Sequence, residues 1–300
     1  MKVLVTGGAG DIGGSVVAAL LPKHEVSILD RVPSERHPEL QFLDVDLQDP
    51  KRTASLIRGF DIVVHLAALP DARSGTQDEI LRVNNACTFN VLEAVRGNGI
   101  PRVVYGSSES ASGYGTQTVS LRPDYFPIDS NHSSWPHEAY SLSKYFGEEM
   151  TRFYAEAHRI DVVSLRYCWV WGGGRSQDQW GKILGEASRG GGKDRLGAWI
   201  AVEDVAQGFA LACDFEYDLP GGNFEYFYLT ARDNFTEVAS LDLVKALWPD
   251  DMPEVRRPEL YEANPKASLF DISKAERMLG YDPQVTTDDL REKFGIEQKT

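Results

Sequence analysis

Residues 3–13 constrain the fold of this chain more than any other stretch, because an apolar, β-branched run leads directly into a glycine-rich loop. The run predicts a strand, the glycines a tight turn, and the apolar periodicity of residues 12–21 a helix. Gly7, Gly10 and Gly13 follow one another at intervals of three residues. A loop of this kind lets the backbone approach a pyrophosphate, whose negative charge then lies at the helix N-terminus. Because the loop directly follows a strand, it favours a dinucleotide-binding turn over an ordinary strand–helix turn.

The following segments continue the alternation of strand and helix. Apolar runs predict strands at residues 25–29, 40–45, 61–67, 102–106, 162–170 and 224–229. Helical patterns occupy residues 51–58, 80–95, 138–158 and 203–214. Such alternation predicts an α/β fold, namely a doubly wound parallel (Rossmann) sheet with helices on both faces. Ligands of these sheets bind beyond the carboxyl ends of the strands.

The composition changes after residue 171, and this sets the predicted domain boundary. Glycine triplets at residues 172–174 and 190–192 bracket a short helical stretch, and the prolines beyond residue 219 indicate small helices and loops. We expect residues 1–171, with 199–230 returning to them, to form the nucleotide-binding Rossmann domain. Residues 172–198 and 231–300 are expected to form a small, discontinuous C-terminal lid that binds substrate.

Composition argues against several classes of partner. The chain has 31 Lys and Arg against 45 Asp and Glu, a net charge of −14, which opposes nonspecific binding to nucleic acid. No apolar run reaches the length of a membrane span and no signal-peptide pattern is found, so we expect a cytoplasmic protein. The three cysteines lie far apart in apolar contexts, which predicts small buried side chains. The six histidines show no ligand spacing, so no metal is expected.

Asp30 ends the second predicted strand, 17 residues after the last loop glycine. A carboxylate at this position accepts both hydroxyls of an adenine ribose and repels the 2′-phosphate of NADP, so it favours NAD. Arg31 follows directly and is able to bind that phosphate, so NADP remains an alternative cofactor. Alternatively, Asp30 only opens a turn. Asp46 and Leu47 either face the adenine edge or provide the N-cap of the next helix.

Tyr140 and Lys144 form a second constellation. Four residues apart on a predicted helix, their side chains share a face. A neighbouring ammonium favours the phenolate, so we expect the pKa of Tyr140 to fall below about 10 and the side chain to act as a general base. Lys144 is also expected to reach the ribose of the cofactor. The same spacing is alternatively typical of an ordinary solvated helix face.

A serine-rich segment, residues 106–110, follows the fifth predicted strand. The carboxyl end of that strand is where a doubly wound sheet places its active site. We expect the hydroxyl of Ser108 to hold a substrate oxygen against Tyr140. The alternative is a polar loop without chemistry.

With these features in place, the chain resembles the extended short-chain dehydrogenase/reductase family, the NAD-dependent sugar epimerases and dehydratases. The resemblance covers nearly the whole chain. It rests on the glycine loop after Thr6, the Tyr140-x-x-x-Lys144 pair, and Ser108 five residues before Gly113. Further matching segments are residues 64–68, the signature of the fourth strand; 83–94, the next helix; 165–172, the strand beside the nicotinamide; and two later landmarks, 202–205 and 271–275.

The resemblance implies a role for each matching residue. The catalytic residues are Ser108, Tyr140 and Lys144. The residues expected to bind NAD are Gly7, Gly10, Asp11, Ile12, Gly13, Asp30, Arg31, Asp46, Leu47, Leu66, Ala67, Ala68, Asn84, Tyr140, Lys144 and Tyr167. The residues expected to contact substrate are Ser108, Glu109, Trp169 and Arg175.

Departures from the family pattern narrow the reaction. Dehydratases of the family carry Thr-Asp-Glu where this chain has Ser108, Glu109 and Ser110, so the glutamate base is replaced and dehydration is not expected. Trp169 and Trp171 stand where smaller or phenolic residues are usual. They either form an apolar wall for a sugar ring or belong to the core.

The resemblance implies NAD-dependent oxidation of a sugar hydroxyl, and C1 of a free aldose or uronate is the favoured position. Members that act on nucleotide sugars usually hold the diphosphate with a segment that is short here, residues 172–201, and that lacks a clear Gly-Asx-Gly turn. Arg175, Lys182 and Arg189 are nevertheless able to clamp a phosphate, so a nucleotide-sugar 4-epimerase is the alternative. A non-catalytic NAD-sensing protein is a further alternative, and a homodimer is a hypothesis for the assembly.

Overall fold

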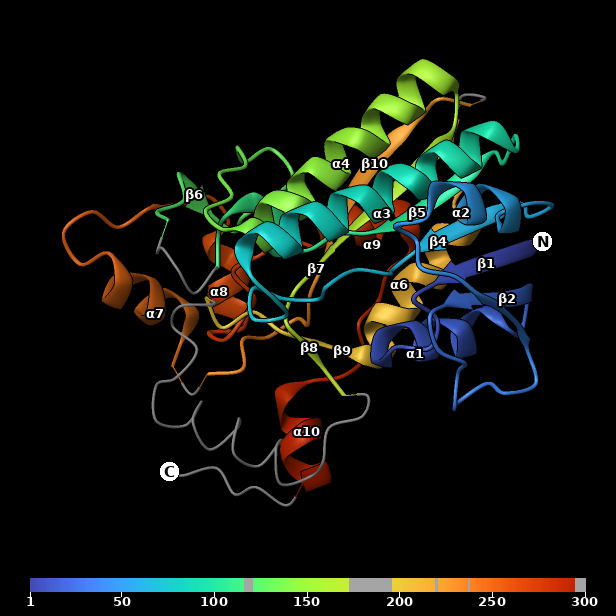
Figure 1. Ribbon diagram of the computed structural model, residues 1–300. Helices are drawn as coiled ribbons and strands as arrows, with labels where there is room; N and C mark the ends of the chain where they lie inside the picture. Colours follow the sequence, from blue (N-terminus) through green and yellow to red (C-terminus); the bar gives the residue numbers. More distant parts are fainter. Residues whose placement is uncertain (116–120, 173–195, 219–220, 237, 295–300) are drawn as a thin grey trace.

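The computed structural model describes residues 1–115, 121–172, 196–218, 221–236 and 238–294. Its centre is a seven-stranded sheet in the order β10-β7-β5-β4-β1-β2-β3, in which every neighbouring pair runs parallel (Figure 1). This order confirms the doubly wound α/β fold. The strands are β1 (Lys2–Thr6), β2 (Glu25–Asp30), β3 (Gln41–Asp44), β4 (Ile62–His65), β5 (Arg102–Gly106), β7 (Asp161–Tyr167) and β10 (Phe224–Leu229).

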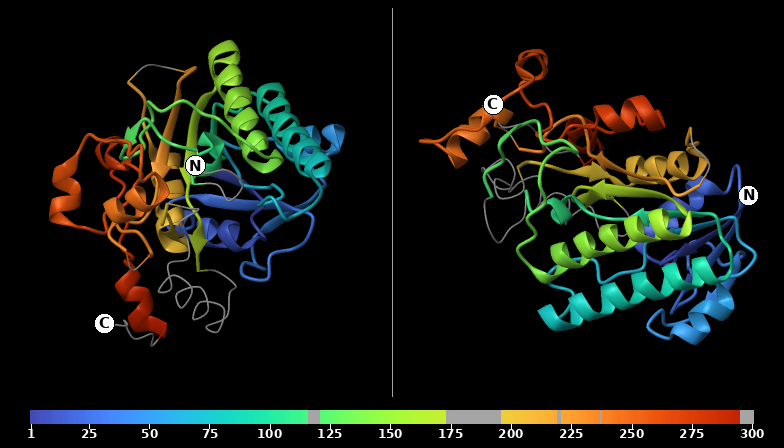
Figure 2. Two further views of the ribbon diagram at one scale, coloured as in Figure 1. Left: turned by 90° about the vertical axis from the view of Figure 1, so that its left-hand side faces the viewer. Right: turned by 90° about the horizontal axis from the view of Figure 1, so that it is seen from above.

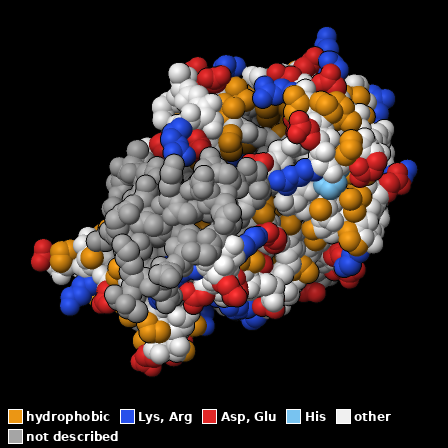
Figure 3. All heavy atoms as spheres, turned by 90° about the horizontal axis from the view of Figure 1, so that it is seen from below, with side chains coloured by type: hydrophobic (Ala, Val, Ile, Leu, Met, Phe, Trp, Pro, Cys, Tyr) orange, Lys and Arg blue, Asp and Glu red, His pale blue; other side chains and the backbone are white. Residues whose placement is uncertain are grey.

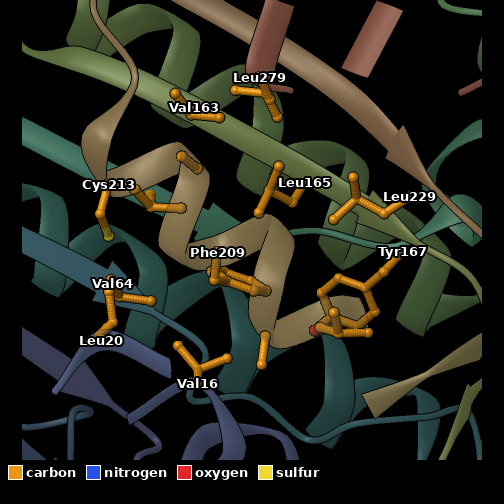
Figure 4. Close-up of a cluster of buried hydrophobic side chains, with 14 of the residues drawn as sticks. Val16, Leu20, Val64, Val163, Leu165, Tyr167, Phe209, Cys213, Leu229 and Leu279 are labelled. Carbon is orange, nitrogen blue, oxygen red and sulfur yellow. The ribbon is translucent and has the colours of Figure 1, made fainter. Parts of the chain in front are cut away.

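Helices cover both faces of the sheet. α1 (Asp11–Leu20) and α6 (Val202–Asp214) pack on one face, where Phe209 of α6 lies among side chains of α1 and the central strands (Figure 4). α2 (Pro50–Leu56), α3 (Gln77–Gly97) and α4 (Ala139–His158) cover the other face, with α3 and α4 side by side (Figure 2). Each face buries its own apolar cluster, as a parallel sheet made of apolar runs requires.

The strand predicted at residues 162–170 is too long, and the structure corrects it. β7 stops at Tyr167, the N–H of Cys168 bonds across to β10, and the C=O of Trp169 accepts from β9 instead. β8 (Val170–Trp171) and β9 (Ile200–Ala201) therefore form a separate two-stranded sheet. The chain leaves the central sheet beside the cavity described below, which residues 167–170 line.

Short elements pack against one end of the sheet. β6 (Tyr125–Phe126) pairs with β11 (Glu254–Val255), and α7 (Ser240–Leu247) and α8 (Pro258–Ala263) share an apolar cluster with them. α9 (Ser273–Leu279) joins the α1–α6 cluster, and α10 (Thr287–Phe294) contributes Leu290 to a cluster of aromatic side chains. The sequence predicted neither the two short strands nor the short helix η1 (Glu109–Ser112).

Local capping explains where two helices near the site begin. The carboxylate of Glu138 accepts from the N–H groups of Tyr140 and Ser141, while the Ser141 hydroxyl accepts from the N–H of Glu138. This capping box starts α4 where the sequence predicts it. α2 begins after Asp49, whose side chain accepts from the first free N–H groups of that helix. The alternative that Asp46 is the N-cap is therefore wrong.

The three cysteines, Cys87, Cys168 and Cys213, are buried, as their apolar contexts predict. None of the described helices combines the length and the apolar character that crossing a membrane requires. On the face shown in Figure 3, acidic and basic side chains are interspersed around the residues that are not described.

Candidate active site

A cavity of about 700 Å³ follows the carboxyl ends of the central strands. Its lining includes the glycine loop at one end and Tyr140 and Lys144 at the other. This is the edge at which doubly wound sheets bind their ligands. The volume lies within the range of roughly 300–1,000 Å³ that is common for ligand and cofactor sites.

The glycine loop connects β1 to α1 at the point where the strand order reverses. Gly7 has a φ of +74°, and a Cβ there would lie 2.7 Å from the nitrogen of Ala67. A Cβ on Gly13 would lie 2.0 Å from the carbonyl oxygen of Gly7, so α1 packs directly on the loop. Gly10 is the N-cap of α1 and brings no capping side chain. The first N–H groups of α1 are thus suited to bind an anionic phosphate.

Asp30 lies at the end of β2 on the cavity wall, with Arg31 beside it. Its carboxylate accepts from the N–H of Ala9 at 3.1 Å and from the N–H of Arg31 at 2.7 Å. The contact with Ala9 fixes the carboxylate against the glycine loop. Asp46 and Leu47 line the same end of the cavity. This end is also lined by residues that the sequence did not single out, namely Leu29, Val32, Val45 and Gln48.

The wall that follows β4 is formed by Leu66, Ala67 and Ala68, the segment that the resemblance places beside the cofactor. Asn84 is not among the described residues that line the cavity. Its side-chain amide instead bonds both the N–H and the C=O of Leu69, and donates to the hydroxyl of Ser143. Asn84 therefore supports this wall from behind and ties it to α4.

Tyr140, Lys144 and Ser108 meet at the opposite end of the cavity. Tyr140 and Lys144 lie near the start of α4, with Lys144 Nζ 5.9 Å from the centre of the Tyr140 ring. Ser108, the N-cap of η1, lies close enough to Tyr140 for its hydroxyl to act on the Tyr140 pKa. Lys144 is 4% exposed, and its ammonium donates to the carbonyl oxygen of Gly106 at 2.7 Å. The structure thus brings all three predicted catalytic residues together.

The expected lowering of the Tyr140 pKa is contradicted by the structure. Burial raises the pKa of Tyr140 well above its ordinary value, and Tyr167 and the charge of Glu109 add to the rise, whereas the nearby Ser108 hydroxyl opposes it. Burial also lowers the pKa of Lys144 to about 8. A shared helix face is therefore not sufficient to favour the phenolate, because the ammonium is directed to a backbone carbonyl and both groups are desolvated.

A buried histidine supports the strands beneath this end. The ring nitrogens of His65 form hydrogen bonds with the hydroxyls of Thr6, at 2.7 Å, and Thr88, at 3.2 Å. Burial lowers the pKa of His65 to about 3, and the charge of Lys144 acts in the same direction. His65 is therefore a neutral link between β1, β4 and α3.

The two tryptophans that follow β7 have different environments. Trp169 is half-buried and lines the cavity together with Tyr167 and Glu109. Trp171 is 1% exposed and packs against Trp199, so it belongs to the core. Only Trp169 is therefore placed to contact a substrate. The cations Arg175, Lys182 and Arg189 lie outside the described residues.

Sequence reasoning missed a buried ion pair behind the serine loop. Arg166 on β7 donates to the two carboxylate oxygens of Glu148, from Nε at 2.8 Å and from Nη2 at 2.6 Å. Ser107 donates to the same carboxylate at 2.5 Å. The pair thus fastens α4, β7 and the serine loop to one another. Glu148 stands four residues after Lys144, and this spacing on a predicted helix is a signal that could have drawn attention to it. Nothing in the sequence, however, pairs Glu148 with Arg166.

A nucleotide-binding edge that continues into a buried tyrosine–lysine pair is the arrangement of the extended short-chain dehydrogenases/reductases, and the chain is an enzyme of that class. Direct comparison then gives the family. The chain belongs to the NAD-dependent epimerase/dehydratase family, whose model matches residues 3–224.

Three of the relatives are sugar enzymes by name. The chain is 33% identical over 178 residues to a putative UDP-glucose 4-epimerase of Methanocaldococcus jannaschii, a match that covers 57% of this chain and 56% of the relative. It is 32% identical over 177 residues to an L-arabinose 1-dehydrogenase (NAD(P)⁺) of Haloferax volcanii, covering 56% of this chain and 67% of the relative. A uronate dehydrogenase of Pseudomonas syringae is 31% identical over 170 residues, a match that covers 55% of this chain and 58% of the relative. These three matches thus span little more than half of this chain, and between 56% and 67% of the length of the relatives.

Solved structures share the fold over the whole chain. The UDP-glucose 4-epimerase of Thermotoga maritima, solved with UDP-glucose, has a TM-score of 0.70 and covers 99% of this chain and 98% of its own. Its sequence identity is 22%, so this likeness bears on the fold alone.

Proposed function

We propose that the protein is an NAD-dependent dehydrogenase that oxidises a free sugar at C1 to a lactone. The observation that carries the proposal is the meeting of Ser108, Tyr140 and Lys144 at the end of a cavity that begins at the glycine loop. A non-catalytic NAD sensor would not need these three side chains in contact with one cavity. The L-arabinose and uronate dehydrogenases among the relatives support this choice of substrate class.

The described residues fit NAD. The close approach of Gly7 to Ala67 and of Gly13 to Gly7 leaves a loop without side chains at the start of α1, as a pyrophosphate requires. The carboxylate of Asp30 lies at the position that accepts the adenine-ribose hydroxyls. Leu66, Ala67 and Ala68 continue the wall toward the catalytic end. When NAD is bound, it supplies the acceptor for the hydride.

The chain's own residues then handle the proton and the substrate oxygen. Tyr140 takes the proton from the sugar hydroxyl, and a hydrogen bond with the Ser108 hydroxyl orients the same oxygen. Lys144 binds the cofactor ribose and, once it faces Tyr140, favours the phenolate. Because burial raises the Tyr140 pKa, the base becomes effective only when positive charge is brought next to it.

We also propose the remaining assignments that follow from the sequence. Residues 172–198 and 231–300 form the substrate lid over a Rossmann domain of residues 1–171 and 199–230. Trp169 provides an apolar wall for the sugar ring, and Arg175 contacts the substrate. NAD is preferred to NADP because of Asp30. The protein acts in the cytoplasm and forms a homodimer.

A second candidate is a nucleotide-sugar 4-epimerase, favoured by the 33% identity to the relative from Methanocaldococcus jannaschii. The two candidates differ in the fate of the cofactor, because an epimerase returns the hydride to its substrate and accumulates no NADH.

One assay separates them. The protein is given NAD with free aldoses or uronates, and separately with UDP-hexoses, while absorbance and sugar products are followed. Net NADH with a free sugar alone is the expected result. Interconversion of UDP-hexoses without net NADH would show the epimerase and overturn the proposal.

A further inference from the structure

Ser107 directly precedes Ser108, the serine proposed to orient the reacting oxygen, and it is completely buried. Its backbone N–H donates to the carbonyl oxygen of Leu165 at 3.0 Å, which continues the pairing of β5 with β7 past the end of β5. Its hydroxyl donates to Glu148 Oε1 at 2.5 Å. Ser107 is therefore fixed to β7 through its backbone and to α4 through its side chain.

The Glu148 carboxylate that accepts this bond is itself held by Arg166. The Nε of Arg166 donates to Oε1 at 2.8 Å and its Nη2 donates to Oε2 at 2.6 Å. Both side chains are 3% exposed. A bidentate pair of this kind fixes the direction of the carboxylate as well as its position. The acceptor for the Ser107 hydroxyl is thus placed by β7, the strand that carries Arg166.

The same guanidinium also holds the chain segment that leads to Tyr140. Nη2 of Arg166 donates to the hydroxyl of Ser134 at 3.1 Å, in the segment just before α4. Nη1 donates to the hydroxyl of Tyr228 at 3.0 Å, and the guanidinium lies over the ring of Tyr226, 4.3 Å from its centre. Contacts with β10 and with the segment before α4 therefore hold the guanidinium from further sides.

Stability alone does not account for a charged pair at this place. Taking two charges out of water is unfavourable, and apolar side chains of similar volume often give equal or greater stability. The pair between Glu148 and Arg166 provides what apolar side chains do not, namely hydrogen bonds of fixed direction to two polar segments. One of these segments carries Ser108, and the other leads to Tyr140.

We infer that Glu148 and Arg166 are positioning residues for the reaction. They hold Ser108 and Tyr140 in the relative placement in which both act on one substrate oxygen. The inference rests on the proposed catalytic roles of these two residues, and it applies to a dehydrogenase and to an epimerase alike. A misplacement of roughly 1 Å that arises outside the reacting groups costs up to about 100-fold in rate, so small shifts of either segment matter.

The removal of single hydroxyls tests the inference without breaking the ion pair. Ser107→Ala releases the segment of Ser108 from Glu148 and keeps both bonds between Glu148 and Arg166. Thr151→Val is its matched control, because Thr151 is buried on α4 and its hydroxyl donates to the backbone carbonyl oxygen of Glu148 at 2.8 Å. Each change deletes one buried hydroxyl that bonds to the same residue, but only the first bond reaches the carboxylate.

Rates are measured with the substrate that the protein turns over, as net NADH for a free sugar or as interconversion for a UDP-hexose. Ser107→Ala should lower kcat by about tenfold while KM stays within about twofold, because a misplaced Ser108 loses interactions of the transition state. Thr151→Val should leave kcat unchanged. Thermal unfolding and titration with NAD show that each variant is folded and binds the cofactor. An unchanged kcat in Ser107→Ala, or an equal loss in Thr151→Val, overturns the inference.

The bond on the Arg166 side gives a second, milder variant. Ser134→Ala removes the acceptor in the segment before Tyr140, and Ser133→Ala removes the hydroxyl of its exposed neighbour. Ser134→Ala should lower kcat by about threefold, and Ser133→Ala should leave kcat unchanged. If the two variants have the same kcat, the pair does not hold this segment and the inference is wrong.

A double-mutant cycle separates positioning from general structural damage. The fall in kcat caused by Ser107→Ala is measured in the wild-type protein and in Ser108→Ala. If Ser107 acts through Ser108, the factor shrinks from about tenfold to about twofold or less once the Ser108 hydroxyl is absent. An equal factor in both backgrounds contradicts the inference. If Ser108→Ala and Tyr140→Phe keep wild-type turnover, or if neither class of sugar is turned over, the proposed function fails and the inference falls with it.

Discussion

The two ends of the cavity are built by different physical means. At the glycine-loop end, the backbone forms most of the wall: Gly7 and Gly13 permit contacts that a Cβ would block, and Asp30 adds one carboxylate that is fixed by the N–H of Ala9. At the catalytic end, buried side chains from α4, η1 and β7 set the charge and protonation of one another. The first end is therefore determined locally, and the second depends on residues distant in the sequence.

This contrast predicts that the two ends respond differently to mutation. Changes at the catalytic end should alter turnover, stability and pH dependence while NAD binding persists. Changes at the glycine-loop end should alter cofactor affinity and choice while the proton chemistry persists. Four substitutions test this separation.

The largest effect is expected for Tyr140→Phe. General acid–base groups contribute roughly 10²–10⁴-fold to rate, so kcat should fall by that factor while the Kd for NAD stays within about twofold. Steady-state rates measure kcat, and titration with NAD followed by quenching of the intrinsic tryptophan fluorescence measures the Kd. If the variant keeps more than about a tenth of wild-type turnover, Tyr140 is not the base.

The next effect concerns the buried pair between Glu148 and Arg166, both with side chains 3% exposed. Glu148→Ala leaves the guanidinium buried without its partner and should lower the free energy of unfolding by about 3–5 kcal/mol. Glu149→Ala is the matched control, because Glu149 pairs with Arg152 on the exposed side of the same helix and should cost less than about 1 kcal/mol. Urea denaturation followed by circular dichroism compares them. Equal losses of stability would show that the buried pair has no special part in holding this end together.

A moderate effect is expected at the other end. Asp30→Ser removes the carboxylate that accepts the ribose hydroxyls and lets Arg31 bind a 2′-phosphate, so the preference for NAD over NADP should shrink by about tenfold or more. Asp44→Ser serves as the control, because Asp44 is exposed at the end of the neighbouring strand and pairs in register with Asp30. The ratio of kcat/KM for the two cofactors is the measurement. Equal efficiency with NAD and NADP in the wild-type protein would refute the role of Asp30.

The smallest effect is a shift in pH dependence. Tyr140 must be deprotonated to act as a base, so kcat/KM rises with pH through its pKa, and the charge of Glu109 holds that pKa up. Glu109→Gln should therefore move the rising limb to lower pH. Rates between pH 6 and 10, with Glu203→Gln for comparison because Glu203 is exposed on α6, show the direction. A shift to higher pH would mean that Glu109 does not act on Tyr140 through its charge.

The two ends of the cavity also differ in how much of their structure the sequence predicts. The glycine loop, the place of Asp30 at the end of β2 and the parallel sheet depend on local pattern, and the sequence predicts all three. The meeting of Ser108 with Tyr140 also followed, because strand ends of a parallel sheet converge at one edge. The direction of the Tyr140 pKa shift did not follow, because it depends on how deeply tertiary packing buries the ring.

The same limit applies to the residues around β7. The sequence gives no sign that the strand ends at Tyr167, so for both Trp169 and Trp171 it leaves open whether they form a wall for a sugar ring or belong to the core. Only the pairing of β8 with β9 separates them, and it leaves Trp169 on the cavity and Trp171 in the core. The sequence does not show the partnership of Glu148 with Arg166 for the same reason, since the two residues stand 18 positions apart on different elements, α4 and β7.

The proposed oxidation at C1 is tested most directly with an aldose deuterated at C1. L-[1-²H]Arabinose and NAD are incubated with the protein, and the reduced cofactor and the sugar products are analysed by mass spectrometry. The account predicts one deuterium in each molecule of reduced cofactor formed, in equal amount with the oxidised sugar. Reduced cofactor without deuterium, or sugar products that retain deuterium at C1 while no reduced cofactor accumulates, would contradict it.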